Sequence, residues 1–145
     1  MVDNKNIDII IKTFKKNNLK LTLQRMNIYS YLMSTCEHPT VDTIYTNIRK
    51  TIPTISLATV YKNLNTLVNS GLIKLINVCE ENFRYDANLD LHAHFKCTSC
   101  NKVEDLYLDD NVLKSLLSRN NTINNLDVFL YGTCTCCSGY TKSNN

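Results

Sequence analysis

The chain has 145 residues and a net charge of +3; 43% of its residues are hydrophobic and 20% are charged. This is the composition of an ordinary globular protein of one domain or two small ones, and no apolar run is long enough to span a membrane. Because Met1 to Lys5 lack the features of a signal peptide, we expect a cytoplasmic protein, in which seven cysteines indicate metal or redox chemistry rather than a disulfide framework.

The first seventy residues have the apolar periodicity of helices. After a first helix, three more are expected to begin behind the capping hydroxyls of Thr22, Thr40 and Ser56, and Gly71 is expected to end the last of them. The apolar residues expected on the inner faces are Ile9, Ile10, Ile11, Phe14, Met26, Ile28, Tyr29, Leu32, Met33, Val41, Ile44, Tyr45, Ile48, Val60, Leu64 and Leu67.

Two strand-like runs, 72–78 and 82–86, follow the last of these helices. Helices followed by a short hairpin predict a winged helix-turn-helix domain over residues 1–87. Residues 88–91 are interpreted as a linker, and residues 92–145 as a second domain.

The second domain has a different pattern, of strands around one helix. The expected elements are strands at 92–96, 102–108 and 126–131, a helix from Val112 to about Arg119, an Asn-rich loop at 120–125 and a frayed tail after Gly139. Asp109 or Asp110 is expected to cap the helix. The predicted fold class is therefore α+β, with an N-terminal winged helix-turn-helix domain and a C-terminal α/β domain.

Two C-x-x-C pairs are the strongest chemical signal. They are Cys97 with Cys100, and Cys134 with Cys137. At this spacing two thiolates from one tight turn can bind a single Zn²⁺, and a closed four-thiolate site stabilises a fold rather than catalysing a reaction. The alternative is a set of redox-active or simply buried thiols. Cys136 is either a spare thiol or an alternative ligand, and Cys36 and Cys79, without a partner at ligand spacing, are interpreted as small hydrophobic residues.

A second set of residues offers nitrogen and oxygen donors. Its members are His38, Asp86, His92, His94 and Asp105. His92 and His94 alternate, so in a strand both imidazoles face the same side of the sheet. Three imidazoles and two carboxylates suit Fe²⁺ or Mn²⁺, and Zn²⁺ binds such sites at least as tightly. The alternative is a group of ordinary surface or core histidines.

His38 lies in the predicted helical domain, whereas the other ligands lie at and after the linker. One ion bound by both groups would hold the two domains at one angle. In a two-fold dimer that angle sets the distance between two recognition helices, which must match the half-site spacing of DNA. Metal occupancy would then switch DNA affinity.

Charge is distributed unevenly along the chain. Residues 1–79 contain ten Lys/Arg and four Asp/Glu, a net charge of +6, whereas residues 80–145 contain six and nine, a net charge of −3. A basic N-terminal half favours a polyanionic partner. The residues expected to contact DNA are Lys15, Lys16, Arg25, Thr59, Tyr61, Lys62 and Asn63, with Lys20 as a further phosphate contact. The alternative is a three-helix bundle with a solvated polar face.

Together these motifs resemble the Fur family of metal-dependent bacterial repressors over nearly the whole chain. Leu19–Arg25 is similar to the family's opening motif, although Leu23 stands where proline is common. Ser56–Leu64 resembles its recognition helix and His92–Cys100 its metal signature. The C-terminal C-x-x-C pair matches members with a structural zinc. The resemblance implies a C-terminal dimerisation domain, a homodimer, and an A/T-rich inverted repeat as the double-stranded DNA operator.

Within the family, iron-uptake regulators typically place Glu where this chain has Asp105, and zinc-uptake regulators commonly use a cysteine among their regulatory ligands. The chain is more similar to the peroxide-sensing members. That similarity implies that Fe²⁺ keeps one position open for H₂O₂, that His38 or His92 takes up oxygen and weakens as a ligand, and that DNA is then released and defence genes are transcribed. With Mn²⁺ the same protein would repress but react little.

Three other functions stay open at this point. The chain could be an iron- or zinc-uptake repressor that senses metal availability. It could be a metalloenzyme such as a hydrolase, although it has no nucleophile motif or Gly-rich phosphate loop. It could also be a zinc-containing interaction module with no regulatory metal. The leading interpretation is a repressor without enzyme activity of its own.

Overall fold

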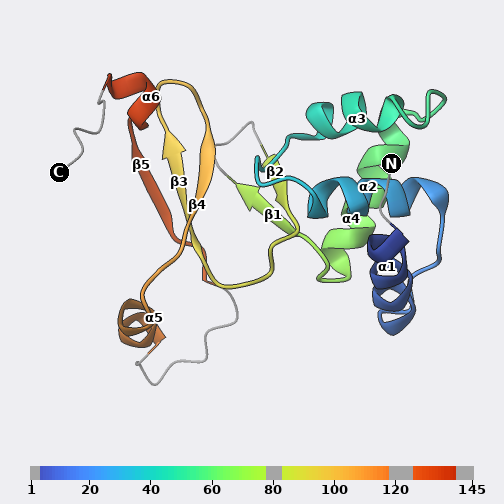
Figure 1. The fold of residues 1–145 in the computed structure, drawn as a ribbon, viewed down its shortest axis with the longest axis horizontal. Coiled ribbons are helices and arrows are strands. Elements are labelled where there is room, and N and C mark those ends of the chain that lie inside the picture. The colour runs from blue at the N-terminus through green and yellow to red at the C-terminus, as the bar shows by residue number, and fades with distance from the viewer. Residues whose placement is uncertain (1–3, 78–82, 118–125, 140–145) are drawn as a thin grey trace. The chain divides into compact units, whose positions relative to one another are not determined.

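A computed structural model of the chain describes residues 4–77, 83–117 and 126–139 (Figure 1). The chain divides into two compact units, Met1–Leu89 and Asp90–Asn145. Within the described residues, the helices are too short or too polar to cross a lipid bilayer.

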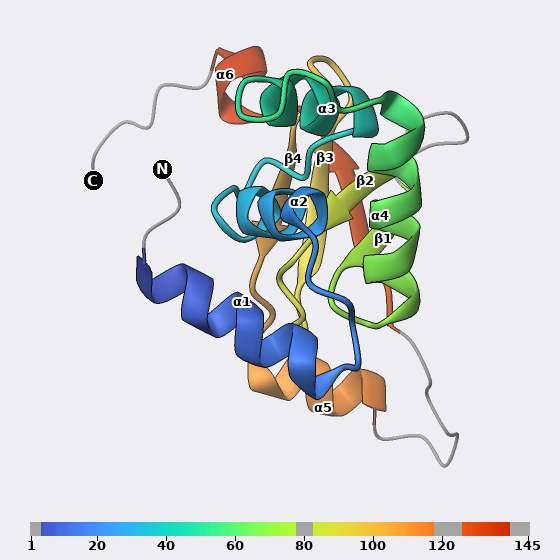
Figure 2. The same ribbon diagram turned by 90° about the vertical axis from the view of Figure 1, so that its right-hand side faces the viewer.

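The N-terminal unit is a set of helices followed by a hairpin (Figures 1 and 2). Its elements are α1 (Asn4–Lys16), α2 (Leu23–Met33), α3 (Val41–Arg49), α4 (Leu57–Asn69), β1 (Lys74–Asn77) and β2 (Phe83–Asp86). The two strands pair antiparallel, with Lys74 opposite Asp86 and Ile76 opposite Arg84. This order is that of a winged helix, as predicted.

The predicted caps are confirmed. The side chains of Thr22, Thr40 and Ser56 each accept a hydrogen bond from a backbone N–H three residues later, and so satisfy one of the unpaired donors at the start of α2, α3 and α4. Gly71, just beyond α4, has φ +66°, a left-handed conformation that suits glycine.

The core of this unit is formed by the inner faces of the four helices and by the start of the hairpin. Its buried residues include Ile10, Phe14, Ile28, Leu32, Ile44, Ile48, Val60, Leu64, Leu67 and Tyr85. Two residues predicted to face inward are exposed, Ile9 at 49% and Met33 at 43%. Ile9 precedes the buried Ile10, and Met33 follows the buried Leu32. Successive side chains of a helix point about 100° apart, so the neighbour of a buried residue turns away from the inner face.

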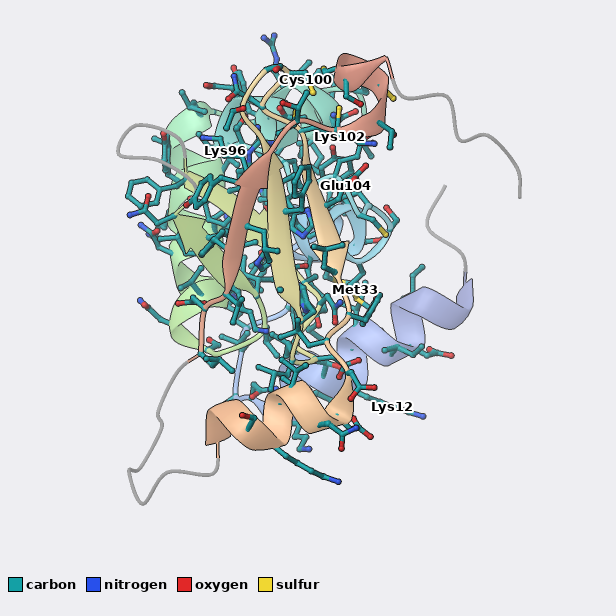
Figure 3. The ribbon with its side chains drawn as sticks, turned by 90° about the vertical axis from the view of Figure 1, so that its left-hand side faces the viewer. Lys12, Met33, Lys96, Cys100, Lys102 and Glu104 are labelled. Carbon is teal, nitrogen blue, oxygen red and sulfur yellow. The ribbon has the colours of Figure 1, made fainter. Side chains whose placement is uncertain are left out.

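The C-terminal unit is built on a sheet with helices beyond its two ends (Figures 1 and 3). Its elements are β3 (Ala93–Cys97), β4 (Val103–Leu106), α5 (Asp110–Leu117), β5 (Phe129–Gly132) and α6 (Thr135–Ser138). The strand order is β4-β3-β5, in which β3 is antiparallel to β4 and parallel to β5. The predicted α+β class is confirmed.

Several predicted boundaries were wrong. β4 and β5 are shorter than expected, α5 begins at Asp110 rather than Val112, and α6 was not predicted. Elements of four residues, such as α6, are too short to show a periodic pattern in the sequence. The predicted cap of α5 is confirmed at Asp109, whose side chain accepts a hydrogen bond from the Asn111 N–H at 2.8 Å. The predictions for 78–82, 118–125 and the tail after Gly139 lie outside the described residues.

Candidate metal centres

Two turns in the C-terminal unit place the four ligand cysteines. Cys97 is the last residue of β3, and the chain then turns through Asn101, whose φ of 59° is left-handed, before β4 begins. Cys134 immediately precedes α6 and Cys137 lies within it. Because Cys97 pairs with Gly132 in the parallel register of β3 and β5, the two turns meet at the same end of the sheet.

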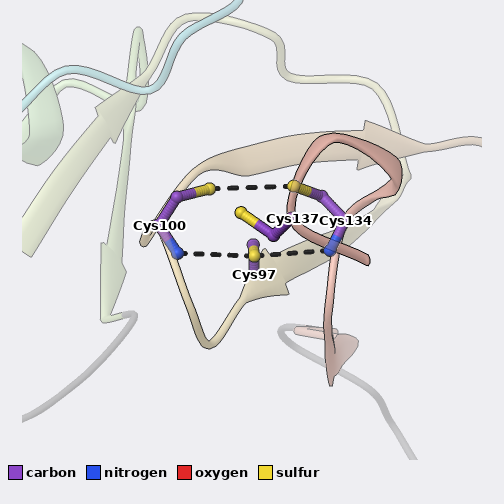
Figure 4. Close-up of side chains that lie close together, drawn as sticks. All are labelled: Cys97, Cys100, Cys134 and Cys137. Atoms are coloured by element: carbon purple, nitrogen blue, oxygen red, sulfur yellow. Dashed lines mark hydrogen bonds between the residues drawn. The ribbon is translucent and has the colours of Figure 1, made fainter. Parts of the chain in front are cut away.

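The geometry of the four sulfur atoms fits one zinc ion. All four lie within 4.8 Å of one another, and Cys100 Sγ is 3.7 Å from Cys134 Sγ (Figure 4). Four sulfurs bound tetrahedrally at about 2.3 Å from zinc are ~3.8 Å apart. The predicted pairing of the two C-x-x-C motifs is therefore the arrangement that the structure brings together.

The thiols of this cluster differ in acidity. The Cys97 sulfur accepts hydrogen bonds from the backbone N–H groups of Cys134 and Cys100, at 3.3 and 3.5 Å, and these bonds lower the pKa of Cys97 to about 6. The pKa of Cys137 rises to about 12 because its thiol hydrogen-bonds to the sulfurs of Cys134 and Cys100. The backbone donors thus favour the thiolate form of Cys97, whereas metal binding must displace the proton of Cys137.

The remaining cysteines stand apart from this cluster. Cys136 is exposed and is not one of the four converging thiols in the described part of the chain. Cys36, interpreted from the sequence as a small hydrophobic residue, is also exposed and does not pack in the core. It follows α2 beyond Ser34, outside the apolar stripe of that helix. Cys79 lies outside the described residues.

A cluster of nitrogen and oxygen donors lies elsewhere in the C-terminal unit. His94 in β3 is paired in register with Asp105 in β4, and His92 immediately precedes β3. His92 Nε2 is 3.0 Å from His94 Nε2 and 3.3 Å from Asp105 Oδ1. Both imidazoles are buried, at 4% exposure each. The predicted alternation of the two histidines therefore directs both rings towards one carboxylate.

These separations suit adjacent positions around one cation. Two ligand atoms about 2.1 Å from an ion and at right angles to each other are ~3.0 Å apart. His92 Nδ1 lies 2.8 Å from the Asp90 carbonyl oxygen, so an Nδ1–H donated there leaves the Nε2 lone pair for the metal. The Asp90 carbonyl was missed by sequence reasoning, because a backbone acceptor carries no side-chain signal.

A second pair of donors lies in the N-terminal unit. His38, just before α3, and Asp86, the last residue of β2, are both buried, with His38 Nε2 3.9 Å from Asp86 Oδ2. The other carboxylate oxygen of Asp86 accepts a hydrogen bond from the Asn88 N–H at 2.7 Å, which orients it. An imidazole beside a carboxylate is the same donor chemistry as in the C-terminal cluster.

The basic residues predicted to contact DNA occupy different environments. Lys15 and Lys16 are exposed at the end of α1, and Tyr61 and Lys62 are exposed near the start of α4. The Arg25 guanidinium is half-buried and donates to the Lys20 carbonyl oxygen at 2.5 Å. The Arg25 guanidinium is therefore less accessible to DNA than the other four side chains.

Two predicted DNA contacts on α4 are engaged within the helix. Asn63 is buried and its amide donates to the Thr59 carbonyl oxygen at 2.8 Å. The Thr59 hydroxyl lies 2.8 Å from that of Ser56. Asn63 falls on the same helical stripe as the core residues Val60, Leu64 and Leu67, a spacing visible in the sequence.

The winged helix, the four-thiolate cluster and the histidine–carboxylate donors define a metal-binding protein of the winged-helix regulator class. Residues 16–131 match the model of the Ferric uptake regulator family, and the chain belongs to this family.

Its relatives include regulators named for peroxide. The transcriptional regulator PerR of Clostridium acetobutylicum is 48% identical over 128 residues, which cover 86% of this chain and 92% of the relative. The peroxide operon regulator of Bacillus subtilis is 31% identical over 131 residues, covering 88% and 90%. The crystal structure of the Campylobacter jejuni peroxide stress regulator is similar with a TM-score of 0.67 and 36% identity, covering 90% of this chain and 98% of that one.

Proposed function

We propose that this chain is a metal-dependent transcriptional repressor that senses hydrogen peroxide. Structural zinc is bound by Cys97, Cys100, Cys134 and Cys137. A regulatory Fe²⁺ or Mn²⁺ is bound by His38 and Asp86 of the N-terminal unit together with His92, His94 and Asp105 of the C-terminal unit. The observation that carries the proposal is the close approach of His92, His94 and Asp105, supported by relatives named as peroxide regulators.

The donor set favours this subtype over zinc-uptake regulation. The regulatory set contains imidazole and carboxylate donors, and the described thiols that converge do so in a separate group. Nitrogen and oxygen donors suit Fe²⁺ and Mn²⁺, and thiolates suit zinc. Because the two sites differ in donor type, zinc can stay bound and stabilise the fold while the regulatory ion binds reversibly.

The histidines are the groups that respond to peroxide. When bound, Fe²⁺ would supply the redox chemistry that splits H₂O₂ next to the ligands, so that one peroxide oxygen passes to an imidazole ring and the other leaves as water. An imidazole of His38 or His92 takes up one oxygen atom and becomes a poorer donor, because oxygen on the ring withdraws the lone pair used for binding. The two units are then no longer held together through these side chains, and the affinity for DNA falls.

Operator binding is assigned to the N-terminal unit. The exposed Tyr61 and Lys62 of α4 lie where a recognition helix meets bases and phosphates, and Lys15 and Lys16 add positive charge at the end of α1. The net charge of +6 over residues 1–79 supports a polyanionic partner. Asn63, because it is buried, is assigned to helix packing rather than to base contact.

A second copy of the chain is the proposed partner of the C-terminal unit. β5 is an edge strand of the described sheet, and Leu130 and Tyr131 on it are 44% and 59% exposed. Exposed apolar residues on an unpaired edge are unfavourable in a monomer and are covered by self-association. Two-fold pairing of this unit places two recognition helices on one inverted-repeat operator.

The decisive experiment uses anaerobic protein loaded with Fe²⁺ on an A/T-rich inverted-repeat duplex, before and after stoichiometric H₂O₂. We expect DNA to be released and a peptide with His38 or His92 to become heavier by one oxygen atom. Protein loaded with Mn²⁺ is the matched control and should stay bound and unmodified. Retained affinity without histidine oxidation would instead identify a sensor of metal availability.

The joint binding of one ion by both units has its own test. His38→Ala should leave the zinc content and the fold intact but weaken Mn²⁺-dependent operator binding. A variant that binds the operator as well as the wild type at the same Mn²⁺ concentration would show that the two units do not share an ion.

A further inference from the structure

His38 has an unusual backbone conformation for its position in the sequence. Its φ is +48°, in the left-handed region that few residues other than glycine adopt. It also precedes Pro39, and a residue before proline ordinarily has an extended backbone. Such a conformation persists only where surrounding contacts impose it.

Those contacts come from β2. The Arg84 guanidinium donates through Nη1 to the His38 carbonyl oxygen at 3.0 Å, across 46 residues of sequence. The next residue, Tyr85, donates its backbone N–H to the Pro39 carbonyl oxygen at 3.1 Å. The residue after that, Asp86, presents its carboxylate to the His38 imidazole. Three consecutive residues of one strand therefore hold the segment that carries His38.

Arg84 and Asp86 occupy alternate positions of β2 and so lie on the same face of the hairpin. One anchors the His38 backbone and the other faces its ring. A half-buried guanidinium suits this task because its several N–H donors have a fixed planar geometry, whereas an ammonium is a flexible point donor.

We propose that Arg84 is a positioning residue for the regulatory ion, an inference that rests on the function proposed above. By holding the His38 carbonyl, Arg84 imposes the left-handed backbone that directs the imidazole towards Asp86. Since Arg84 is paired with Ile76 and Asp86 with Lys74, the same contact ties the ligand segment to both strands of the wing. The geometry of His38 and that of the wing are therefore coupled.

The first test measures metal affinity. Mn²⁺ binding to zinc-loaded protein, followed by the electron paramagnetic resonance signal of free Mn²⁺, is compared for the wild type, Arg84→Met and Arg84→Lys. Loss of a group that orients a ligand typically weakens metal binding by about 10- to 100-fold. We expect that loss in Arg84→Met and a partial recovery in Arg84→Lys, with one zinc per chain and the thermal midpoint retained. Arg49→Met, at an exposed arginine on α3, is the matched control and should bind Mn²⁺ normally.

The second test needs no regulatory metal. In zinc-only protein, amide exchange of Tyr85 should be faster in Arg84→Met than in the wild type, while amides in the middle of α4 are unchanged. Wild-type Mn²⁺ affinity and wild-type Tyr85 exchange in Arg84→Met would overturn the inference. So would equal loss of Mn²⁺, zinc and thermal stability in both Arg84 variants, because that pattern marks a general structural role. If the wild type itself binds no second ion, the proposed function fails, whereas Tyr85 exchange still tests the contact.

Discussion

His92 and His94 present their Nε2 atoms 3.0 Å apart, with both rings buried. Two imidazole lone pairs cannot face each other at this distance without a cation or a proton between them. Asp105 Oδ1 lies 3.3 Å from the first and 3.9 Å from the second, so the cluster also includes a negative charge. The sheet register brings these atoms together into a set of donors that could bind one divalent cation.

Replacement of Asp105 tests this conclusion directly. Asp105→Asn keeps the shape of the side chain but removes the charge, so Mn²⁺ affinity should fall by at least about 100-fold, the upper end for residues that merely support a ligand. Titration of free Mn²⁺ by electron paramagnetic resonance measures the change. Glu104→Gln, the neighbouring carboxylate, pairs with Lys102 instead and is the control (Figure 3). Unchanged affinity in Asp105→Asn would remove this residue from the site.

The zinc cluster should contribute most of the stability of the C-terminal unit. Cys97→Ser removes the buried ligand whose thiolate receives two backbone hydrogen bonds, and should reduce zinc content from one per chain to near zero. Unfolding of the C-terminal unit should follow. Elemental analysis and near-ultraviolet circular dichroism measure the two effects. Cys136→Ser should retain zinc and structure, and loss of zinc from that variant would make Cys136 a ligand.

Two adjacent residues of α4 should have opposite effects. Lys62 is exposed, so Lys62→Ala should weaken operator binding and reduce the slope of log affinity against log salt by about 1, without changing stability. Asn63 is buried and hydrogen-bonded to Thr59, so Asn63→Ala should lower the free energy of unfolding by about 1 kcal/mol. Fluorescence anisotropy at several salt concentrations measures the effect on operator binding, and urea unfolding measures the effect on stability. A stable Asn63→Ala variant that loses operator affinity would restore Asn63 as a base contact.

The edge strand β5 should mediate self-association. Leu130→Glu places a charge on its exposed apolar surface and should shift the protein from dimer to monomer, while the zinc content stays at one per chain. Sedimentation velocity measures the assembly state. Lys114→Glu on α5 reverses a charge at another exposed position and should remain dimeric. A Leu130→Glu variant that sediments as the wild type does would move the dimer interface elsewhere.

Local chemistry accounts for what the sequence by itself determined. The caps at Thr22, Thr40 and Ser56, the C-x-x-C pairs and the alternating His92 and His94 depend on neighbours within a few residues, and all could be read directly. The burial of Asn63 could also have been predicted from its spacing to Val60 and Leu67, although the sequence analysis interpreted the residue as a DNA contact.

Only the tertiary structure decided which distant groups meet. The register of β3 with β4 places Asp105 opposite His94, and the parallel pairing of β3 with β5 brings the two cysteine turns to one end of the sheet. The Arg84 side chain reaches the His38 carbonyl across 46 residues. A backbone acceptor has no side-chain signature, and strand register depends on the packing of whole faces, so neither is encoded in any short stretch of sequence.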